Sequence, residues 1–451
     1  MSVNLDNIID EMQSDIVRAV QSSVKIDSIE GNPVDGMPFG RGPAEALHHA
    51  LKLASRLGFK TKNIDNMVGY AEFGKGKEMV AVLGHLDVVA AGDGWKHPPF
   101  GAEICDERIW GRGTMDNKGP TIGSLFAMKA IAKSGLEISR RVRVIFGTNE
   151  ETGSKDMDRY NETEEAPIMG FTPDARYPII FAEKGILTIS LSKKLDQGNG
   201  GVKLIRITGG KAANMVPDLA SAVVVNREGI EEKYIAKGLA AHGSTPEMGI
   251  NAIIDLMHQL KKLDFCYDLK QWLSFILEKI GDETDGKTLG IKMMDDKSGA
   301  LTLNLGTMVS ETIDGTNPNG FFDVQEIEAK INIRYPITKT FHDIELAINT
   351  LAEEAGIEAK IISHKKPLYV SENSELIRKL QKVYEKKTGD KAKLLAFGGG
   401  TYAKTMNNTV AFGPIFPGQK DVTHQANEFI SIENLMKNIK IMAAAMYELA
   451  R

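Results

Sequence analysis

Hydrophobic and polar positions form two different patterns along the first part of the chain. Residues 78–84 form a near-continuous apolar run, and 141–154 begin with a similar run, as is typical of strands covered on both faces. Residues 44–57 and the second half of 109–135 instead carry apolar positions at helical spacing. Strands that alternate with helices in this way predict a layered α/β domain.

The pattern changes after residue 184. Several of the following apolar segments alternate with polar residues, which is typical of an antiparallel sheet with one covered face. The expected strands are 186–192, 202–210, 299–310 and 324–336, with helices at 250–263 and 341–355. Helical spacing then returns at 374–390 and 431–449.

The simplest organisation is therefore one domain interrupted by another. We expect an α/β domain formed by residues 1–184 and 367–451, with a mixed, mostly parallel sheet and helices on both faces. Residues 185–366 are expected to form an inserted α+β domain.

Composition narrows the class of protein. The chain is 42% hydrophobic and 25% charged with a net charge of -5, and it has no long basic cluster, which argues against a nucleic-acid partner. Its two cysteines, Cys105 and Cys266, form neither a disulfide framework nor a cysteine-based zinc site. The amphipathic N-terminal segment has no basic leader or cleavage site, and no run approaches the roughly 18 apolar residues of a membrane span. We expect a cytoplasmic protein without a membrane partner.

The first candidate for chemistry lies at the end of the apolar strand 78–84. His85 and Asp87 stand two residues apart, so in an extended chain their side chains point to the same side. Sites in open α/β sheets form beyond the carboxyl ends of strands, where these residues lie. Taken alone, such a pair is more commonly a hydrogen-bonded polar pair or plain loop residues than half of a metal site.

Further candidates flank other elements of the same domain, and each has an ordinary explanation. Asp116 precedes a predicted helix and could cap it; Glu150 and Glu151 could form a solvated acidic turn; Asp174 could be a turn aspartate; His424 could be structural. Together they supply imidazoles and carboxylates, the ligands that zinc and similar ions accept. A two-metal hydrolase also needs a bridging carboxylate and a general base. The combination favours such a site.

The motifs resemble those of the di-metal aminoacylase/carboxypeptidase superfamily of metallopeptidases, and within it the PepV-type dipeptidases of bacteria, which are Xaa-His, carnosinase-like enzymes. The resembling segments run in family order through nearly the whole chain: GHLDVV (84–89), GWKHPPF (94–100), WGRGTMDNKGP (110–120), GTNEETG (147–153), PDARYPI (173–179), HGSTPEMG (242–249), NIRYP (332–336), GGGTYAK (398–404) and THQANEF (423–429).

This resemblance implies a set of ligands for two divalent ions. Asp116 would bridge the ions. His85 and Asp174 would complete one of them, and Glu151 and His424 would complete the other. Zinc is the expected ion, with manganese or cobalt as alternatives.

The resemblance also implies roles for residues beside the ligands. Glu150 would be the general base that takes a proton from water to form a metal-bridged hydroxide. Asp87 would orient His85 from behind. The peptide bond between Asp116 and Asn117 would be cis.

The inserted domain would be a lid that holds the substrate. His242 would polarise the scissile carbonyl, Asn214 would lie near the same oxygen, and Arg334 would bind the substrate carboxylate. Without the resemblance, the sequence favours His242 as a turn or helix-start residue, and Arg334 could be the partner in a surface salt bridge. A glycine-rich loop would approach the substrate backbone through Gly399, Gly400 and Thr401. That loop lacks the GK[ST] ending of a phosphate-binding loop.

The predicted function is hydrolysis of free-amine dipeptides by a monomeric, metal-dependent dipeptidase. An N-acyl amino acid deacylase or desuccinylase on the same scaffold would share every metal ligand. A non-catalytic binding protein would not need Glu150, and a phosphate-binding enzyme would leave the histidines and acids unexplained.

Overall fold

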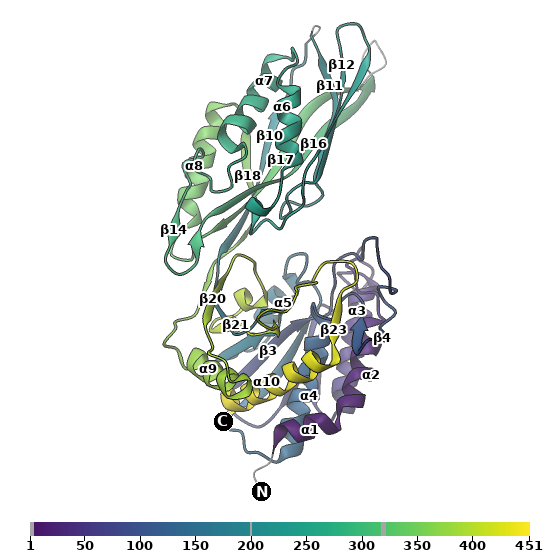
Figure 1. Ribbon diagram of the computed structural model, residues 1–451, viewed down its shortest axis with the longest axis vertical. Coiled ribbons are helices and arrows are strands. Elements are labelled where there is room, and N and C mark those ends of the chain that lie inside the picture. Colours follow the sequence, from purple (N-terminus) through teal and green to yellow (C-terminus); the bar gives the residue numbers. More distant parts are fainter. Residues whose placement is uncertain (1–3, 199–200, 317–321) are drawn as a thin grey trace. The chain divides into compact units, whose positions relative to one another are not determined.

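The computed structural model describes residues 4–198, 201–316 and 322–451, and the chain divides into two compact units. The first unit comprises residues 1–181, 370–395 and 401–451, and the second comprises 182–369 and 396–400 (Figure 1). The short segment 396–400, which the expected division assigned to the α/β part, belongs to the second unit.

The first unit is built on a mixed sheet in the order β1-β2-β6-β3-β7-β21-β9-β19, with β20 also paired to β9. Its strands are β1 (Lys60–Ile64), β2 (Val68–Phe73), β3 (Met79–His85), β6 (Arg141–Gly147), β7 (Met169–Thr172), β9 (Ile179–Glu183), β19 (Leu368–Tyr369), β20 (Leu394–Phe397) and β21 (Thr409–Ala411). The last residues of β9 and β20, and all of β19, lie in the second unit. The predicted mixed sheet is confirmed, but it is not mostly parallel: the parallel pairs β6-β3, β3-β7 and β7-β21 lie at its centre, and the pairs on both sides of them are antiparallel.

Helices cover both faces of this sheet, as predicted. The helical elements of the unit are α1 (Leu5–Glu11), α2 (Gln13–Val24), α3 (Arg41–Arg56), α4 (Lys118–Ser134), α5 (Lys155–Thr163), α9 (Glu375–Thr388), the short 3-10 turn η3 (Tyr402–Thr405) and α10 (Ile432–Ala450). Alternate residues of β3 face opposite ways: Ala81 and Leu83 pack in a cluster with residues of α5 and η3, whereas Gly84 faces α4.

Short strands outside the main sheet frame the loops of the first unit. They are β4 (Glu103–Cys105), β5 (Arg108–Trp110), β8 (Ala175–Arg176), β22 (Pro414–Ile415) and β23 (Phe429–Ser431). β23 pairs with β5, and β22 pairs with β8. These pairings bring the C-terminal loops beside loops that come from the first half of the chain.

The second unit has an antiparallel sheet in the order β13-β12-β11-β16-β17-β10-β18. Its elements are β10 (Gly185–Lys194), β11 (Lys203–Gly209), β12 (Leu219–Val225), β13 (Glu231–Lys237), η1 (Pro246–Met248), α6 (Ala252–Leu260), α7 (Tyr267–Phe275), the π-helical turn η2 (Ile276–Ile280), β14 (Met294–Asp295), β15 (Gly299–Ala300), β16 (Thr302–Thr316), β17 (Phe322–Tyr335), α8 (Phe341–Glu354) and β18 (Glu358–Lys365). The predicted α+β architecture is confirmed.

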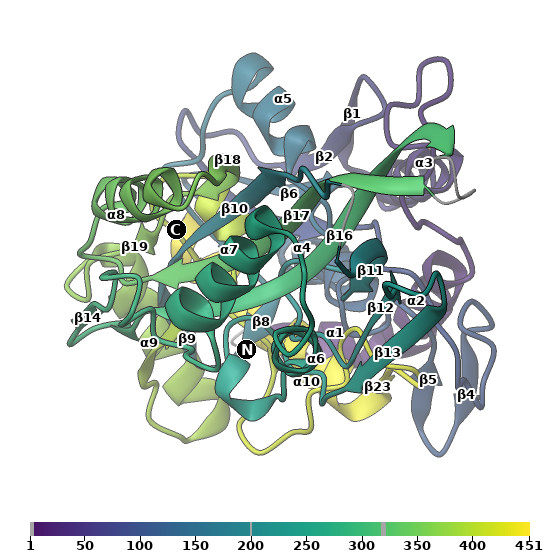
Figure 2. The same ribbon diagram turned by 90° about the horizontal axis from the view of Figure 1, so that it is seen from above.

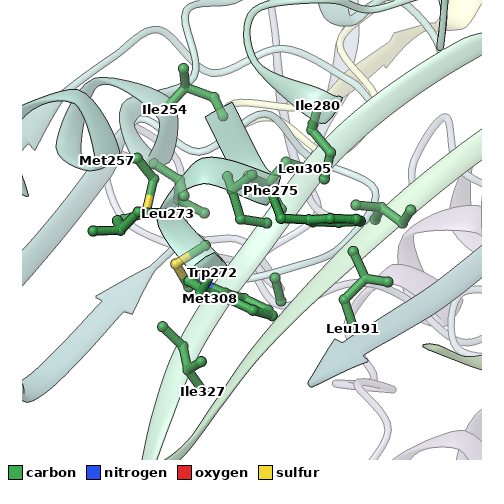
Figure 3. Packing of buried hydrophobic residues seen from close by; sticks show 14 of the residues in the cluster. Leu191, Ile254, Met257, Trp272, Leu273, Phe275, Ile280, Leu305, Met308 and Ile327 are labelled. Carbon is green, nitrogen blue, oxygen red and sulfur yellow. The ribbon is translucent and has the colours of Figure 1, made fainter. Parts of the chain in front are cut away.

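Helices α6, α7 and α8 cover one face of this sheet (Figure 2). Between helices and sheet lies one continuous core, in which Trp272 of α7 packs among residues such as Met308 of β16 and Ile327 of β17 (Figure 3). Alternation in β10 explains the arrangement: Leu187, Ile189 and Leu191 are buried in this core.

Among residues 4–198, 201–316 and 322–451, no helix combines the length and the apolar character needed to cross a membrane.

Candidate metal centre

Three adjacent parallel strands of the first unit end at the same edge of the sheet and deliver candidate ligands there. His85 is the last residue of β3 and pairs in register with Gly147, the last residue of β6. Glu151 follows β6, and Asp174 follows β7. Because β6, β3 and β7 are neighbours, their carboxyl ends gather these side chains into one place.

Asp116 reaches the same place from the loop that leads into α4. This loop lies close to β3 because Gly84 has no side chain: a Cβ there would stand 2.1 Å from the hydroxyl oxygen of Thr121. The residue at the N-cap of α4 is Asn117, so the carboxylate of Asp116 is not a helix cap. The predicted cis peptide between Asp116 and Asn117 is present.

The carboxylate of Asp116 lies between two imidazoles. Its Oδ1 is 3.0 Å from Nε2 of His85, and its Oδ2 is 3.0 Å from Nε2 of His424. Asp174 Oδ1 lies 3.5 Å from the same nitrogen of His85, and Glu151 Oε2 lies 3.1 Å from that of His424. Two groups of possible ligands result, each with atoms within 4.8 Å of one another, and Asp116 belongs to both.

The buried carboxylates of this cluster favour the binding of cations. Burial raises the pKa of Asp174 to about 7, and burial together with nearby Asp116 raises the pKa of Glu151. Burial alone would lower the pKa of His424, but hydrogen bonds to Asp116 and Glu151 outweigh it and raise the pKa to about 12. In the protein alone, protonated imidazoles balance the acids. Two divalent ions could take over that balance, and the nitrogen and oxygen donor set suits zinc and similar metals.

Asp87 contacts both sides of the cluster through its backbone and its side chain. Nδ1 of His85 lies 3.0 Å from the backbone oxygen of Asp87 and 3.5 Å from its carboxylate. A carbonyl only accepts, so Nδ1 carries the proton and Nε2 is left to bind an ion. The carboxylate Oδ2 of Asp87 accepts a hydrogen bond of 3.0 Å from the backbone N–H of Glu151. Asp87 thus fixes two candidate ligands at once.

Glu150 is half-buried beside Glu151 in the loop after β6. The start of this loop is held by Asp156, a buried carboxylate that accepts hydrogen bonds from the backbone N–H groups of Thr148 and Asn149 and from the hydroxyl of Tyr402. Asp156 was not among the predicted site residues, since nothing in the local sequence pattern marks an aspartate in a helix as buried.

The second unit brings together most of the predicted substrate-binding residues. The backbone of Asn214 accepts a hydrogen bond from Gly243, and Met215 forms a bridge with His242. Nδ1 of His242 lies 2.7 Å from the hydroxyl of Ser244 and accepts from its backbone N–H at 3.3 Å. Backbone N–H groups only donate, so in the neutral ring Nε2 carries the proton.

The glycine loop and Arg334 belong to the same region of the second unit. Arg334 donates to the Oδ1 of Asn332 at 2.8 Å and to the backbone oxygen of Gly398 at 3.1 Å. Gly398 packs so closely on Ser244 that a Cβ there would lie 2.9 Å from the Ser244 Cβ. Arg334, Gly398 and the His242 loop are therefore in one contiguous region.

Arg334 is 4% exposed, and burial lowers its pKa to about 10. Within the described part of the chain, no carboxylate forms an ion pair with it. Gly399 and Gly400 continue the loop within this unit, whereas Thr401 belongs to the first unit, where its hydroxyl caps η3 by accepting from Ala403. A buried arginine without an acidic partner is suited to bind an anion.

Comparison with known proteins agrees with this geometry. Residues 81–448 match the model of peptidase family M20/M25/M40. A protein of Bacillus subtilis (strain 168) named "Putative dipeptidase YtjP" is 37% identical over 470 residues, which cover 97% of this chain and 98% of the relative.

Solved structures share the fold at low sequence identity. Human carnosine dipeptidase 1 aligns with a TM-score of 0.63 and 16% identity over 99% of this chain and 98% of that one. The YXEP protein of Bacillus subtilis, described as a dinuclear metal binding peptidase, aligns with a TM-score of 0.54 and 10% identity over 98% and 99%. The predicted membership is confirmed: the chain is an enzyme of peptidase family M20/M25/M40.

Proposed function

We propose that this protein is a metal-dependent dipeptidase that hydrolyses free-amine dipeptides with two divalent ions. The observation that carries the proposal is the position of Asp116. Its Oδ1 lies 3.0 Å from Nε2 of His85, and its Oδ2 lies 3.0 Å from Nε2 of His424. A carboxylate that faces two ligand groups in this way can be shared by two ions. His85 and Asp174 would hold one ion with it, and Glu151 and His424 the other.

The bound ions would polarise the scissile carbonyl and lower the pKa of the attacking water towards 7. Glu150, adjacent to the ligand Glu151, would take a proton from that water and deliver it to the amine that leaves. Asp87 would keep both His85 and the Glu151 backbone in place, since it contacts each of them.

The second unit would supply the groups that hold the peptide. Arg334 would bind the C-terminal carboxylate, because its guanidinium is buried and lacks an acidic partner among the described residues. His242 would donate Nε2–H to the carbonyl oxygen as negative charge develops there, and Asn214 would lie near the same atom. Gly399 and Gly400 would allow the peptide backbone to approach closely.

The test is hydrolysis by purified protein that has been stripped with a chelator and then given Zn²⁺, Mn²⁺ or Co²⁺. The substrates are a dipeptide, the same dipeptide with an N-acetyl group, and an N-acetyl amino acid. The proposal expects metal-restored cleavage of the free dipeptide, with far slower cleavage of the two acetylated compounds. The ion that restores activity best identifies the working metal, for which we propose zinc.

Two results would contradict the proposal in different ways. Preferential cleavage of the N-acetyl amino acid would identify a deacylase with the same metal ligands. No turnover by protein that binds two ions would favour a non-catalytic binding protein. The cytoplasmic location and the monomeric state remain predictions, and light scattering during gel filtration would check the latter.

A further inference from the structure

A buried carboxylate that is not a candidate ligand lies directly behind Asp116. Glu428 is 0% exposed, at the end of the loop that carries His424. Its Oε1 accepts hydrogen bonds from the backbone N–H groups of Met115 at 2.9 Å and Asp116 at 3.1 Å. The loop that contributes one candidate ligand thus holds the backbone of another.

The other oxygen of Glu428 pairs with Arg112, which is also buried. Arg112 Nη1 lies 2.8 Å from Glu428 Oε2 and donates at 3.3 Å to the backbone oxygen of Gln425. Its Nη2 donates to the backbone oxygens of Ala90 at 3.3 Å and Ala91 at 3.2 Å. A single guanidinium therefore joins the loop after β3 to the loop of His424.

Three ligand-bearing loops meet in this network: the one that follows His85, the one that contains Asp116, and the one that contains His424. A buried ion pair contributes little to net stability compared with apolar packing, because removing two charges from water is costly. Its value here lies in geometry, since planar Arg–carboxylate pairing fixes orientation. Groups behind the ligands commonly control metal affinity.

We propose that Glu428 and Arg112 are positioning residues that hold the Asp116 and His424 loops in the ion-binding geometry before any ion arrives. The inference rests on the proposed two-ion site and adds to it the residues that preorganise its ligands. Both residues lie in segments already noted for their family resemblance, 110–120 and 423–429. Only the folded chain shows that they form a pair.

The experiment measures ion binding rather than activity. Full-length, metal-stripped protein is titrated with Zn²⁺ by calorimetry, and the absorption spectrum of the Co²⁺-loaded protein reports the ligand geometry. In Glu428→Gln, one oxygen remains, which can serve either the Asp116 backbone or Arg112 but not both. We expect at least one of the two ions to bind about 10- to 100-fold more weakly and the Co²⁺ spectrum to change.

Two further variants separate positioning from general destabilisation. Glu72→Gln breaks another largely buried arginine–carboxylate pair, with Arg143 at 2.6 Å. Arg143 stands four residues before the end of β6, away from the ligands. The Glu72→Gln variant should have a lower unfolding temperature but an unchanged affinity for the ions. In Arg112→Lys, the lysine keeps a cation beside Glu428 but cannot contact both neighbouring loops, so ion binding should weaken in this variant as well. This variant provides the test if Glu428→Gln does not fold.

The outcomes distinguish this inference from the proposed function. Wild-type protein that binds two ions, with unchanged affinities and Co²⁺ spectra in Glu428→Gln and Arg112→Lys, would overturn the positioning role alone. Wild-type protein that binds no ions would overturn the two-ion site itself. Equal weakening by Glu72→Gln would show that ion affinity follows overall stability instead of this network.

Discussion

Replacing Arg334 by glutamine tests the proposed substrate carboxylate site, because the change should lower catalysis and leave stability almost unchanged. Arg334 is almost fully buried, its described hydrogen bonds go to neutral oxygens of Asn332 and Gly398, and no described carboxylate balances its charge. Among the described residues, the guanidinium is therefore a buried positive charge that a bound carboxylate could neutralise.

The structure sets the size of the effect. Burial lowers the pKa of Arg334 from the usual range of a guanidinium to about 10. At about 1.4 kcal/mol for each tenfold change in proton affinity, this corresponds to roughly 3 kcal/mol of unfavourable charge burial in the free protein. Removing one partner of a buried, hydrogen-bonded charge pair costs about 2–5 kcal/mol. At about 1.4 kcal/mol for each tenfold change, we therefore expect Arg334→Gln to lower kcat/KM for a free dipeptide by roughly 30-fold or more.

Two controls separate this role from a structural one. A dipeptide amide has no carboxylate, so its kcat/KM should change by less than about threefold, since no charge pair is lost. The free energy of unfolding of the variant should stay within about 1 kcal/mol of wild type, because relief of charge burial offsets the lost hydrogen bonds. The reasoning is refuted if the dipeptide and its amide lose activity equally, or if the variant loses several kcal/mol of stability.

Three further changes test other parts of the molecule. Glu150→Gln should lower kcat by about 10²- to 10⁴-fold while calorimetry still detects two ions, and a loss of ion binding would instead make Glu150 a ligand. In the metal-free protein, burial raises the pKa of Asp156 to about 6, so the stability contributed by its proton is complete below about pH 4 and is lost as the pH rises through 6. Asp156→Asn should remove a pH dependence of about 3 kcal/mol between pH 4 and 7 in urea unfolding, and parallel curves for the two proteins would contradict this. Trp272 is 0% exposed in the core of the second unit, so Trp272→Ala should lower the free energy of unfolding in urea by about 3–5 kcal/mol. A decrease below about 1 kcal/mol would show that this core can collapse around the gap.

Local patterns in the sequence were sufficient to predict most elements and the types of residue in the candidate site. The apolar run before His85 is β3, and the helical spacing before Gly135 is α4. Such predictions succeed because strand and helix periods depend on neighbouring residues alone. Where burial is partial, the sequence signal is weaker: β13 has mostly exposed and half-buried residues, and it was not among the predicted strands.

The candidate site shows where local information ends. Its residue types and its motifs were apparent from the sequence, but Asp116 alone is indistinguishable from a helix cap. Only the strand order β6-β3-β7 shows that residues distant in the chain meet at one edge, and only the side-chain geometry places Asp116 between two imidazoles.

The sequence by itself determined which donors are present, which elements carry them, and that the family resemblance extends over nearly the whole chain. The tertiary structure decided which of these groups are buried and what faces each one. Asp156 and Glu428 were not candidates in the sequence, yet in the fold each accepts backbone N–H groups from a ligand-bearing loop. Burial and long-range hydrogen bonds depend on strand order and loop packing, which no short stretch of sequence encodes.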